Sequence, residues 1–446
     1  MKFDLYCTRP VLKDGIIVDI EKGKLVYDNM TSVLLNSDGS EVKYTDDKLY
    51  KCTYSAFRTS EQTPAKKSSS IRNLKIQLGL SCNYSCTYCS QRFVPVNPSE
   101  TNVSYINKFI SNMDSWCKSE PQEIEFWGGE PFVYWKTLKP LAEQLRKKFP
   151  KAKFLIITNG SILTEEIIDW IEKLDISVGI SHDGPGQFVR GPDPLDDPKQ
   201  KEIILSLFKR RSGKVSFNSM INKHNMDRKK IQNFFQNLLN TEDFVIGEGS
   251  FIDAYDDGGV QNSLSTYEDH LVLRRTTTHQ IRDQEINKFM VVHKRMNEWF
   301  NSILSQRNAE VLGQKCGMDR EDTISVDLRG NILTCQNVSA VSTAPNGRSH
   351  LIGHVSNINK ARLTTATHWS FREECTNCPV LQVCKGSCMF LQKDLFKKSC
   401  DNAYSDHISF FAVAIEMLTG WLPYRIEAQD YNLPEERIDL WGKPNV

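Results

Sequence analysis

From Leu74 onward the chain alternates short apolar segments with amphipathic segments, and this alternation restricts its fold more than any other sequence feature. Strands that alternate with helices pair in parallel, through right-handed crossovers. Several such units in succession curl into an open barrel. We therefore predict an α/β fold, a partial (β/α)6 barrel similar to a TIM barrel, with strands at 74–80, 123–127, 153–158, 176–181, 215–221 and 244–252 and helices at 102–117, 136–148, 164–173, 198–211 and 226–240.

The segments on either side of the predicted barrel have other patterns. Short apolar runs at 15–20, 24–27 and 32–35, separated by turn signals, predict a small β-rich N-terminal region of unknown role, and a linker is predicted at 60–70. The predicted division of the chain is 1–71 for this N-terminal region, 72–260 for the barrel, 261–312 for a helical connection, 313–405 for a cysteine-rich domain, and 406–446 for a C-terminal helix and tail.

The charge composition limits the kinds of partner. Lys plus Arg (56) and Asp plus Glu (55) nearly balance, so the chain lacks the basic excess typical of proteins that bind nucleic acid or an anionic membrane. The first residues contain no basic segment followed by an apolar run, and no apolar stretch is long enough to span a membrane. We expect a cytoplasmic protein whose partners are neither nucleic acids nor membranes.

The 13 cysteines fall into groups. In a reducing compartment, closely spaced thiols indicate metal binding or catalysis rather than disulfides. Three cysteines stand at 82, 86 and 89, and seven lie between 316 and 400. Cys7, Cys52 and Cys117 stand alone, and we predict that they are small buried apolar side chains.

The Cys82-x3-Cys86-x2-Cys89 segment follows the first predicted strand. Its three thiolates can hold three irons of a cubane cluster and leave the fourth iron without a protein ligand. Zinc is the alternative, but a structural zinc site needs four ligands, and no further Cys or His lies near this loop. Glycine-rich or polar loops also follow the next three strands, at the face where barrel enzymes place their chemistry.

The cysteine loop, with Tyr88 just before its last cysteine, resembles the radical S-adenosylmethionine (SAM) superfamily. The resemblance implies a 4Fe-4S cluster whose open iron binds SAM, and an electron that cleaves SAM to a 5′-deoxyadenosyl radical. It further implies that Tyr88 lies against the adenine, that Glu130 receives the SAM ammonium, and that Arg190 holds the SAM carboxylate. The SAM-binding residues it implies are Tyr88, Gly128, Gly129, Glu130, Pro131, Asn159, Ser181, Asp183 and Arg190, with turn capping as the alternative for Asn159 and Asp183.

The later cysteines form a seven-residue pattern that resembles the SPASM extension of radical SAM enzymes that mature peptides and proteins. A β-hairpin predicted over 323–335, with its turn at Gly330, would bring the first two of these cysteines to one end. A zinc ribbon is the alternative for the Cys375-x2-Cys378 pair. The resemblance implies two auxiliary iron-sulfur clusters, one held by Cys375, Cys378, Cys384 and Cys400 and the other by Cys316, Cys335 and Cys388.

Seven cysteines are one too few for two cubane clusters, which together have eight irons. Asp322, six residues after Cys316, is the predicted additional ligand, since a carboxylate can bind iron, although less strongly than a thiolate. The alternative is that Asp322 belongs to a solvated acidic turn at 319–322 and that one iron is open.

The resemblance also predicts the type of reaction. SPASM enzymes form carbon-carbon or thioether cross-links in peptides or oxidise a sulfatase Cys or Ser to formylglycine, and the sulfatase-maturing group has an aspartate base just after the cysteine that ends the hairpin. This chain has Gln336 there, and glutamine cannot take a proton. We therefore expect oxidative modification of a ribosomally made peptide or small protein, with a flavodoxin- or ferredoxin-type electron donor; the alternatives are sulfatase-type oxidation and, from another class, an iron-sulfur electron carrier.

Overall fold

The computed structural model describes residues 1–13, 16–45, 65–97, 101–253, 257–363 and 367–442. Cys52 and much of the predicted linker at 60–70 lie outside these residues. Within them, no helix is long and apolar enough to cross a membrane.

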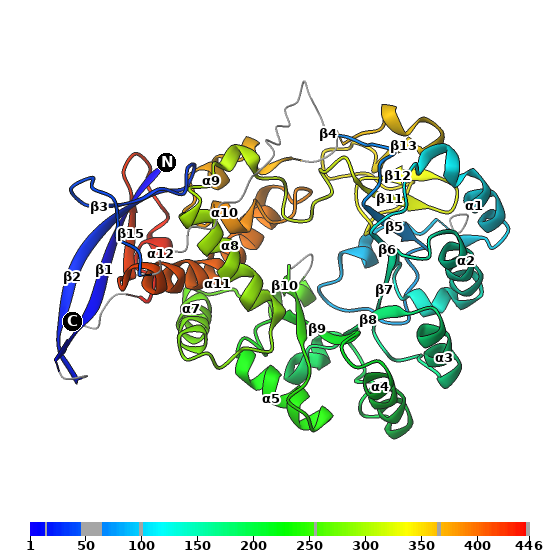
Figure 1. Ribbon diagram of the computed structural model, residues 1–446, viewed down its shortest axis with the longest axis horizontal. Coiled ribbons are helices and arrows are strands. Elements are labelled where there is room, and N and C mark those ends of the chain that lie inside the picture. Colours follow the sequence, from blue (N-terminus) through cyan, green and yellow to red (C-terminus); the bar gives the residue numbers. More distant parts are fainter. Residues whose placement is uncertain (14–15, 46–64, 98–100, 254–256, 364–366, 443–446) are drawn as a thin grey trace.

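The barrel predicted from the alternating pattern is confirmed. Its six parallel strands lie side by side in sequence order, with the first four helices outside the curved sheet (Figure 1). Each observed element overlaps a predicted one. The strands are β5 (Asn73–Gln77), β6 (Glu123–Trp127), β7 (Lys153–Thr158), β8 (Ile176–Ser181), β9 (Val215–Ile221) and β10 (Ile246–Phe251), and the helices are α1 (Tyr105–Trp116), α2 (Trp135–Lys148), α3 (Glu165–Lys173), α4 (Pro198–Arg210) and α5 (Arg228–Leu239).

Alternation along the strands separates the core from the barrel interior. Ile76, Phe126 and Ile156 are neighbours across β5, β6 and β7, and all three are fully buried in the core. Their chain neighbours Trp127 and Ile157 instead line a large pocket. Because successive strand residues point to opposite faces, the same strands that build the core also present side chains to the pocket.

The predicted hairpin of the cysteine-rich part is also confirmed, and it joins the barrel sheet. Strands β11 (Thr323–Asp327) and β12 (Asn331–Leu333) turn at Gly330, whose φ of 87° lies in the left-handed region that favours glycine. Strand β11 pairs in parallel with β5, and β13 (Leu351–His354) continues the sheet beyond β12. The hairpin therefore covers the edge of the barrel that β5 would leave open.

The two ends of the chain share a second sheet. Its order is β15-β1-β2-β3, formed by Leu422–Ala428, Lys2–Lys13, Ile16–Asp28 and Leu34–Asn36. Side chains buried at every second position of β1, including Cys7, form its inner face. Cys7 and Cys117 are buried as predicted. The β-rich N-terminal region is confirmed, whereas β15 comes from the C-terminal tail, where no strand was predicted.

A long helix, α11 (Lys393–Thr419), lies between this sheet and the barrel (Figure 1). Phe411 on α11 contacts Tyr27 of β2 and Trp299 of α8, with ring centroids 5.0 and 4.9 Å apart. The remaining elements are β4 (Ala65–Lys66), α6 (Asp257–Asn262), α7 (Tyr267–Arg282), α8 (Met290–Leu304), β14 (Arg362–Leu363), α9 (Glu373–Thr376), α10 (Leu381–Cys384) and α12 (Glu435–Ile438).

A buried network of four charges joins the barrel to these helices. Arg228 of α5 donates to both oxygens of Glu248 on β10 (2.7 and 2.9 Å) and to Asp406 on α11 (2.7 Å). Arg295 of α8 donates to the other oxygen of Asp406 (2.6 Å). Burial raises the pKa of Asp406, but the charges of both arginines outweigh burial and hold the pKa below its usual value.

Replacement of Arg228 tests this network. In Arg228→Met, two buried carboxylates lose a cation, so the free energy of unfolding should fall by about 3–5 kcal/mol. Arg210→Met is the matched control, because Arg210 also bonds several carboxylates but does so at the surface, where solvent screens them. Urea unfolding followed by circular dichroism measures both variants. Equal losses in the two would contradict the role of the buried network.

Candidate active site

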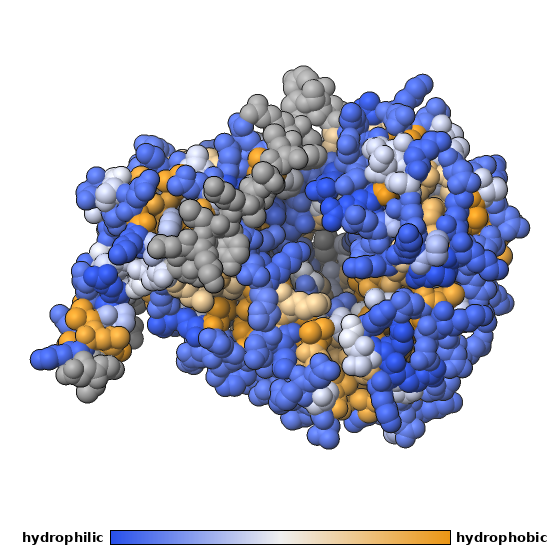
Figure 2. Space-filling view, in the orientation of Figure 1, coloured by the Kyte–Doolittle hydropathy of each residue, from blue (hydrophilic) through white to orange (hydrophobic). Residues whose placement is uncertain are grey.

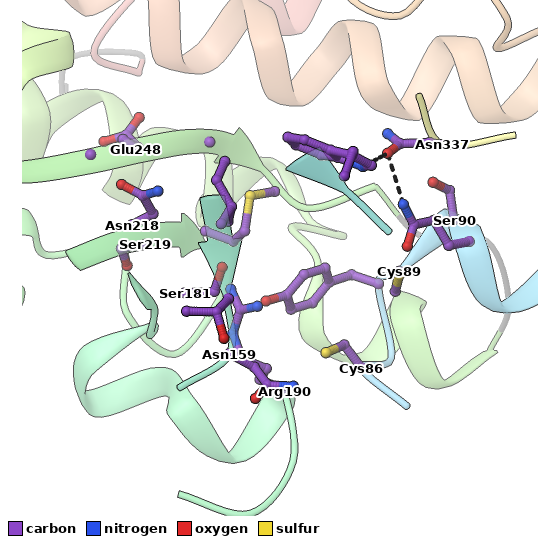
Figure 3. Close-up of a pocket in the computed structure, with 18 of the residues that line it drawn as sticks. Cys86, Cys89, Ser90, Asn159, Ser181, Arg190, Asn218, Ser219, Glu248 and Asn337 are labelled. Carbon is purple, nitrogen blue, oxygen red and sulfur yellow. Dashed lines mark hydrogen bonds between the residues drawn. The ribbon is translucent and has the colours of Figure 1, made fainter. Parts of the chain in front are cut away.

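One pocket of about 1000 Å³ lies at the carboxyl ends of the barrel strands (Figure 3). The face of the molecule is hollowed between the barrel and the helical part (Figure 2). One wall of the pocket comes from the cysteine loop and the loops after β6, β7 and β8, and the opposite wall from α8, α11 and the cysteine-rich part. The pocket includes most of the residues predicted to bind SAM.

The three cysteines of the first group all line this pocket. Burial raises the pKa of the Cys86 thiol to about 12 and also raises that of Cys82. The loop is held in place by Asn83, which accepts a hydrogen bond from Asn159 (2.8 Å), and by Tyr84, which donates to the Pro192 carbonyl (2.7 Å). Three thiols on one anchored loop beside a large pocket fit a cluster with one open iron.

The Gly-Gly-Glu-Pro loop packs directly on the cysteine loop. A Cβ atom on Gly129 would lie 2.3 Å from the Ser81 carbonyl oxygen, so only glycine fits there. The amide of Glu130 donates to that same carbonyl (3.0 Å). Pro131 begins a short 3-10 turn, 131–134, behind the pocket. The glycines therefore allow two backbone segments to approach each other.

The Glu130 carboxylate already has three protein donors. They are the amides of Phe132 (3.1 Å) and Asn159 (2.7 Å) and the Thr158 hydroxyl (2.8 Å). Burial raises the pKa of Glu130 to about 6, although these donors oppose the rise. The carboxylate thus ties the loop after β6 to the loop after β7, in addition to the predicted contact with the SAM ammonium.

Asp183 is the centre of a buried cluster behind the pocket. It accepts hydrogen bonds from the Tyr88 hydroxyl (2.8 Å), from Arg190 (2.9 Å) and from the Met220 amide (2.9 Å). The Arg190 guanidinium lies 5.5 Å from the Tyr88 ring centre. Both Tyr88 and Arg190 line the pocket, whereas Asp183 does not. The Nε atom of Arg190 has no partner among the described residues, so one of its donors remains for a ligand.

Asn159 and Ser181 occupy the ends of β7 and β8. The Asn159 side-chain oxygen accepts from the amide and hydroxyl of Ser161 (3.0 and 2.6 Å). This is the turn-capping arrangement that the sequence left open as an alternative. Asn159 also lines the pocket, as does Ser181.

Four of the later cysteines surround a second, small cavity: Cys375, Cys378, Cys384 and Cys400. They are the set that the SPASM resemblance implies for one auxiliary cluster. Among the described residues, no three His, Cys, Asp or Glu side chains converge as they would around a single metal ion. Arg437, from the C-terminal tail, donates to the Cys400 sulfur (3.4 Å), and a cation at this position favours a thiolate.

Cys316, Cys335 and Cys388 form the other group. Burial, together with the nearby charges of Cys316 and Cys388, raises the pKa of Cys335 to about 12. Asp322 does not join them in this conformation, because its two oxygens each accept from Arg320 (3.0 Å). Its role as an iron ligand stays a prediction and requires this ion pair to open.

Several pocket residues were not found from the sequence. Trp127 donates to Asn337 (2.8 Å), which brings the segment after Cys335 onto the pocket (Figure 3). Asn218 of β9 lies against the backbones of Gly179 and Gly247, where any Cβ would collide with it. Lys315 and Lys385 each adjoin a predicted iron ligand in the sequence, and this adjacency could have identified them as residues near the site.

Comparisons with known proteins agree with this geometry. Residues 76–235 match the model of the Radical SAM superfamily. The radical SAM cyclopropyl synthase TigE of Paramaledivibacter caminithermalis is 25% identical over 186 residues, which are 37% of this chain and only 39% of that protein. The cysteine-type anaerobic sulfatase-maturating enzyme of Clostridium perfringens is 23% identical over 340 residues, 69% of this chain and 85% of that protein.

A solved structure shares the fold. Native anSMEcpe with bound AdoMet superposes with a TM-score of 0.54 and 17% identity, over 77% of this chain and 96% of that one. The protein is thus an α/β partial-barrel protein with its pocket at the carboxyl ends of the strands. More specifically, it carries a radical SAM domain, and its homologues include sulfatase-maturating enzymes and a cyclopropyl synthase.

A methyl group at Gly129 tests how the loops position the site. In Gly129→Ala, the new Cβ must push the loop away from Ser81, and SAM affinity should fall by roughly tenfold, or about 1.4 kcal/mol. Gly213→Ala is the control, since no atom lies within 4 Å of its Cβ position, and its φ of 75° makes it the more strained site for the backbone. Equilibrium dialysis of radiolabelled SAM against the reconstituted protein measures both. Full SAM affinity in Gly129→Ala would contradict this role.

Proposed function

We propose that this protein is a radical SAM enzyme with two auxiliary iron-sulfur clusters that oxidatively modifies a side chain of a ribosomally made peptide. The observation that carries the proposal is one pocket that joins Cys82, Cys86 and Cys89 to the Gly-Gly-Glu-Pro loop and to the ends of the barrel strands. A family match over these same residues supports it.

The chain's own residues would bind and orient the cofactors. When bound, the cluster and SAM supply a 5′-deoxyadenosyl radical, generated with an electron from a flavodoxin- or ferredoxin-type donor. Tyr88 and Arg190 are fixed by Asp183, and Glu130 fixes the two loops beside the cysteines, so the wall facing SAM is organised before SAM binds. The pocket walls, with a substrate across the opening, would shield the radical from water.

The pocket volume of about 1000 Å³ is at the upper end of the range usual for small-molecule sites, and we infer that its far wall accommodates part of a peptide. Relatives support this substrate class, since anSMEcpe has been solved with bound AdoMet and a peptide. Gln336 cannot act as the base that sulfatase-type oxidation uses, so we favour a carbon-carbon or thioether cross-link or a related oxidation.

Removal of the first cysteine group tests the enzyme assignment. The reconstituted protein should hold about 12 irons if all three clusters are cubanes. It should also release 5′-deoxyadenosine from SAM with dithionite. The Cys82→Ala, Cys86→Ala, Cys89→Ala triple variant should lose about four irons and all of this release.

Cys7→Ala with Cys117→Ala is the matched control, because these thiols lie outside both cysteine groups and should not change the iron content. Iron analysis and chromatography of the nucleoside products give the readouts. Zinc in place of iron would instead support a structural metal site. A wild-type protein that holds three clusters yet never cleaves SAM would support an electron carrier. Mass spectrometry of a co-expressed precursor separates the products, since a cross-link removes two hydrogens, whereas formylglycine formation from cysteine removes two hydrogens and also replaces sulfur by oxygen. Formylglycine formed from serine has the same mass change as a cross-link, and the reaction of its aldehyde with a hydrazide identifies it.

A further inference from the structure

The pocket wall opposite the cysteine loop is rich in cations. It is built by α8, the segment before Cys316, the end of α10, and α11. Its charged or ionisable side chains are Lys294, Arg295, Glu298, Lys315, Lys385 and His407.

Only part of this positive charge is neutralised within the protein. Arg295 bonds to Asp406 and lies 3.4 Å from Glu248. Lys385 lies 3.3 Å from Glu298. Lys294 and Lys315 form no ion pair anywhere in the described residues. The buried Asp253 carboxyl group interacts with Lys315 over a longer distance, whereas Lys294 has no such acidic neighbour among the described residues, so the wall presents an excess of positive charge to whatever enters the pocket.

His407 on the same wall is an unpaired buried group. Its side chain is 1% exposed, and neither ring nitrogen has a hydrogen-bond partner in the described residues. Burial holds its pKa well below the usual value, and the charges of Arg295 and Lys315 lower it further. The ring is thus neutral, with one donor and one acceptor unused. Buried polar groups in native proteins are normally paired, so an unpaired one that lines a pocket points to a ligand.

Lys315 and Lys385 each adjoin a cysteine, which raises the alternative that they balance the charge of a cluster. Lys315 also lines the pocket, so its charge can act on a ligand there whether or not it also balances a cluster. Its charge acts on His407, and on Asp253, whose pKa is raised to about 6 by burial against the effect of Lys315. Lys294 lies on α8, which carries no cysteine, and its charge acts on Lys385. Cluster balancing would also leave His407 unexplained.

We propose that this wall binds a carboxylate of the peptide substrate, with Lys294 and Lys315 supplying the charge and His407 the hydrogen bond. The inference rests on the proposed function and narrows its substrate class to peptides with an acidic group next to the reacting residue. An Asp or Glu side chain and a C-terminal carboxylate share this chemistry. Arg190 lies on the wall of the cysteine loop, is paired with Asp183, and keeps its free Nε for the predicted contact with SAM.

Three synthetic fluorescent peptides with a common Gly/Ser-rich sequence test the site. One has central glutamates and an amidated C-terminus, one has glutamines and an amidated C-terminus, and one has glutamines and a free C-terminal carboxylate. Binding to the reconstituted, SAM-loaded protein is measured by fluorescence anisotropy at low salt, where charge contacts are least screened. A carboxylate probe should bind roughly tenfold more tightly than the neutral one, as expected for a charge-assisted contact. Whichever of the two carboxylate probes shows the preference identifies the source of the group.

The Lys294→Gln, Lys315→Gln double variant should lose this preference. The matched control is Lys136→Gln with Lys147→Gln, which removes the same charge from the exposed face of α2 and should keep the preference. Equal binding of all three peptides to the wild type would overturn the proposal, as would a preference that survives in the pocket variant.

His407→Phe provides a second, independent test. The phenyl ring has a similar shape, and no protein hydrogen bond is lost, so the melting temperature should not fall. The preference for the carboxylate probe should drop severalfold. An unchanged preference with a lower melting temperature would show that His407 is structural and remove it from the site. Release of 5′-deoxyadenosine by the wild type, measured separately, tests the proposed function, because a charge preference in binding does not depend on it.

Discussion

The network of Arg228, Arg295, Glu248 and Asp406 fixes the distance between the two walls of the pocket. Glu248 stands on the last barrel strand, and Asp406 stands on the long helix that also packs on the terminal sheet. Both arginines bridge these elements. A buried ion pair adds little net stability compared with an apolar contact, but each member is costly to leave alone. The network therefore favours the one arrangement of the barrel and the helices in which all four charges are paired.

Strand pairing between distant parts of the chain also holds the barrel, the cysteine-rich part and the terminal sheet together. An open barrel has two edges, and an exposed edge strand invites further pairing. Strand β11 closes the β5 edge, so the cysteine-rich part becomes continuous with the barrel rather than a flexible appendage. The pairing of β1 with β15 joins residues separated by nearly the whole chain. Arg437, just after β15, can then reach Cys400, so the terminal sheet also organises the surroundings of the second cysteine group.

The predictable parts of the fold were those encoded by local pattern. Strand and helix periodicity located the six barrel units, and the Gly330 turn located the hairpin, because both signals depend only on near neighbours. The pairings β11 with β5 and β1 with β15 were not predictable, since an apolar strand does not specify a distant partner. Four cysteines that the family resemblance assigns to one cluster line a single small cavity, and the ligand sets themselves stay predictions. Cysteine spacing could not show that Asp322 would pair with Arg320, a bond that depends on how the turn before β11 bends.

The two walls of the pocket differ in how their polar groups are used. At the cysteine loop, Glu130 and Asp183 are satisfied by protein donors, so that wall is rigid without a ligand. Preorganised groups of this kind hold a reactive cofactor in one orientation at no further cost. On the opposite wall, Lys294 and His407 have no protein partner in the described chain, so their interactions remain available. An enzyme that makes a radical must hold its cofactor in one orientation. It can select its substrate through charged and hydrogen-bonding groups that have no partner until the substrate binds. The charge pattern of this pocket meets both requirements within one cavity.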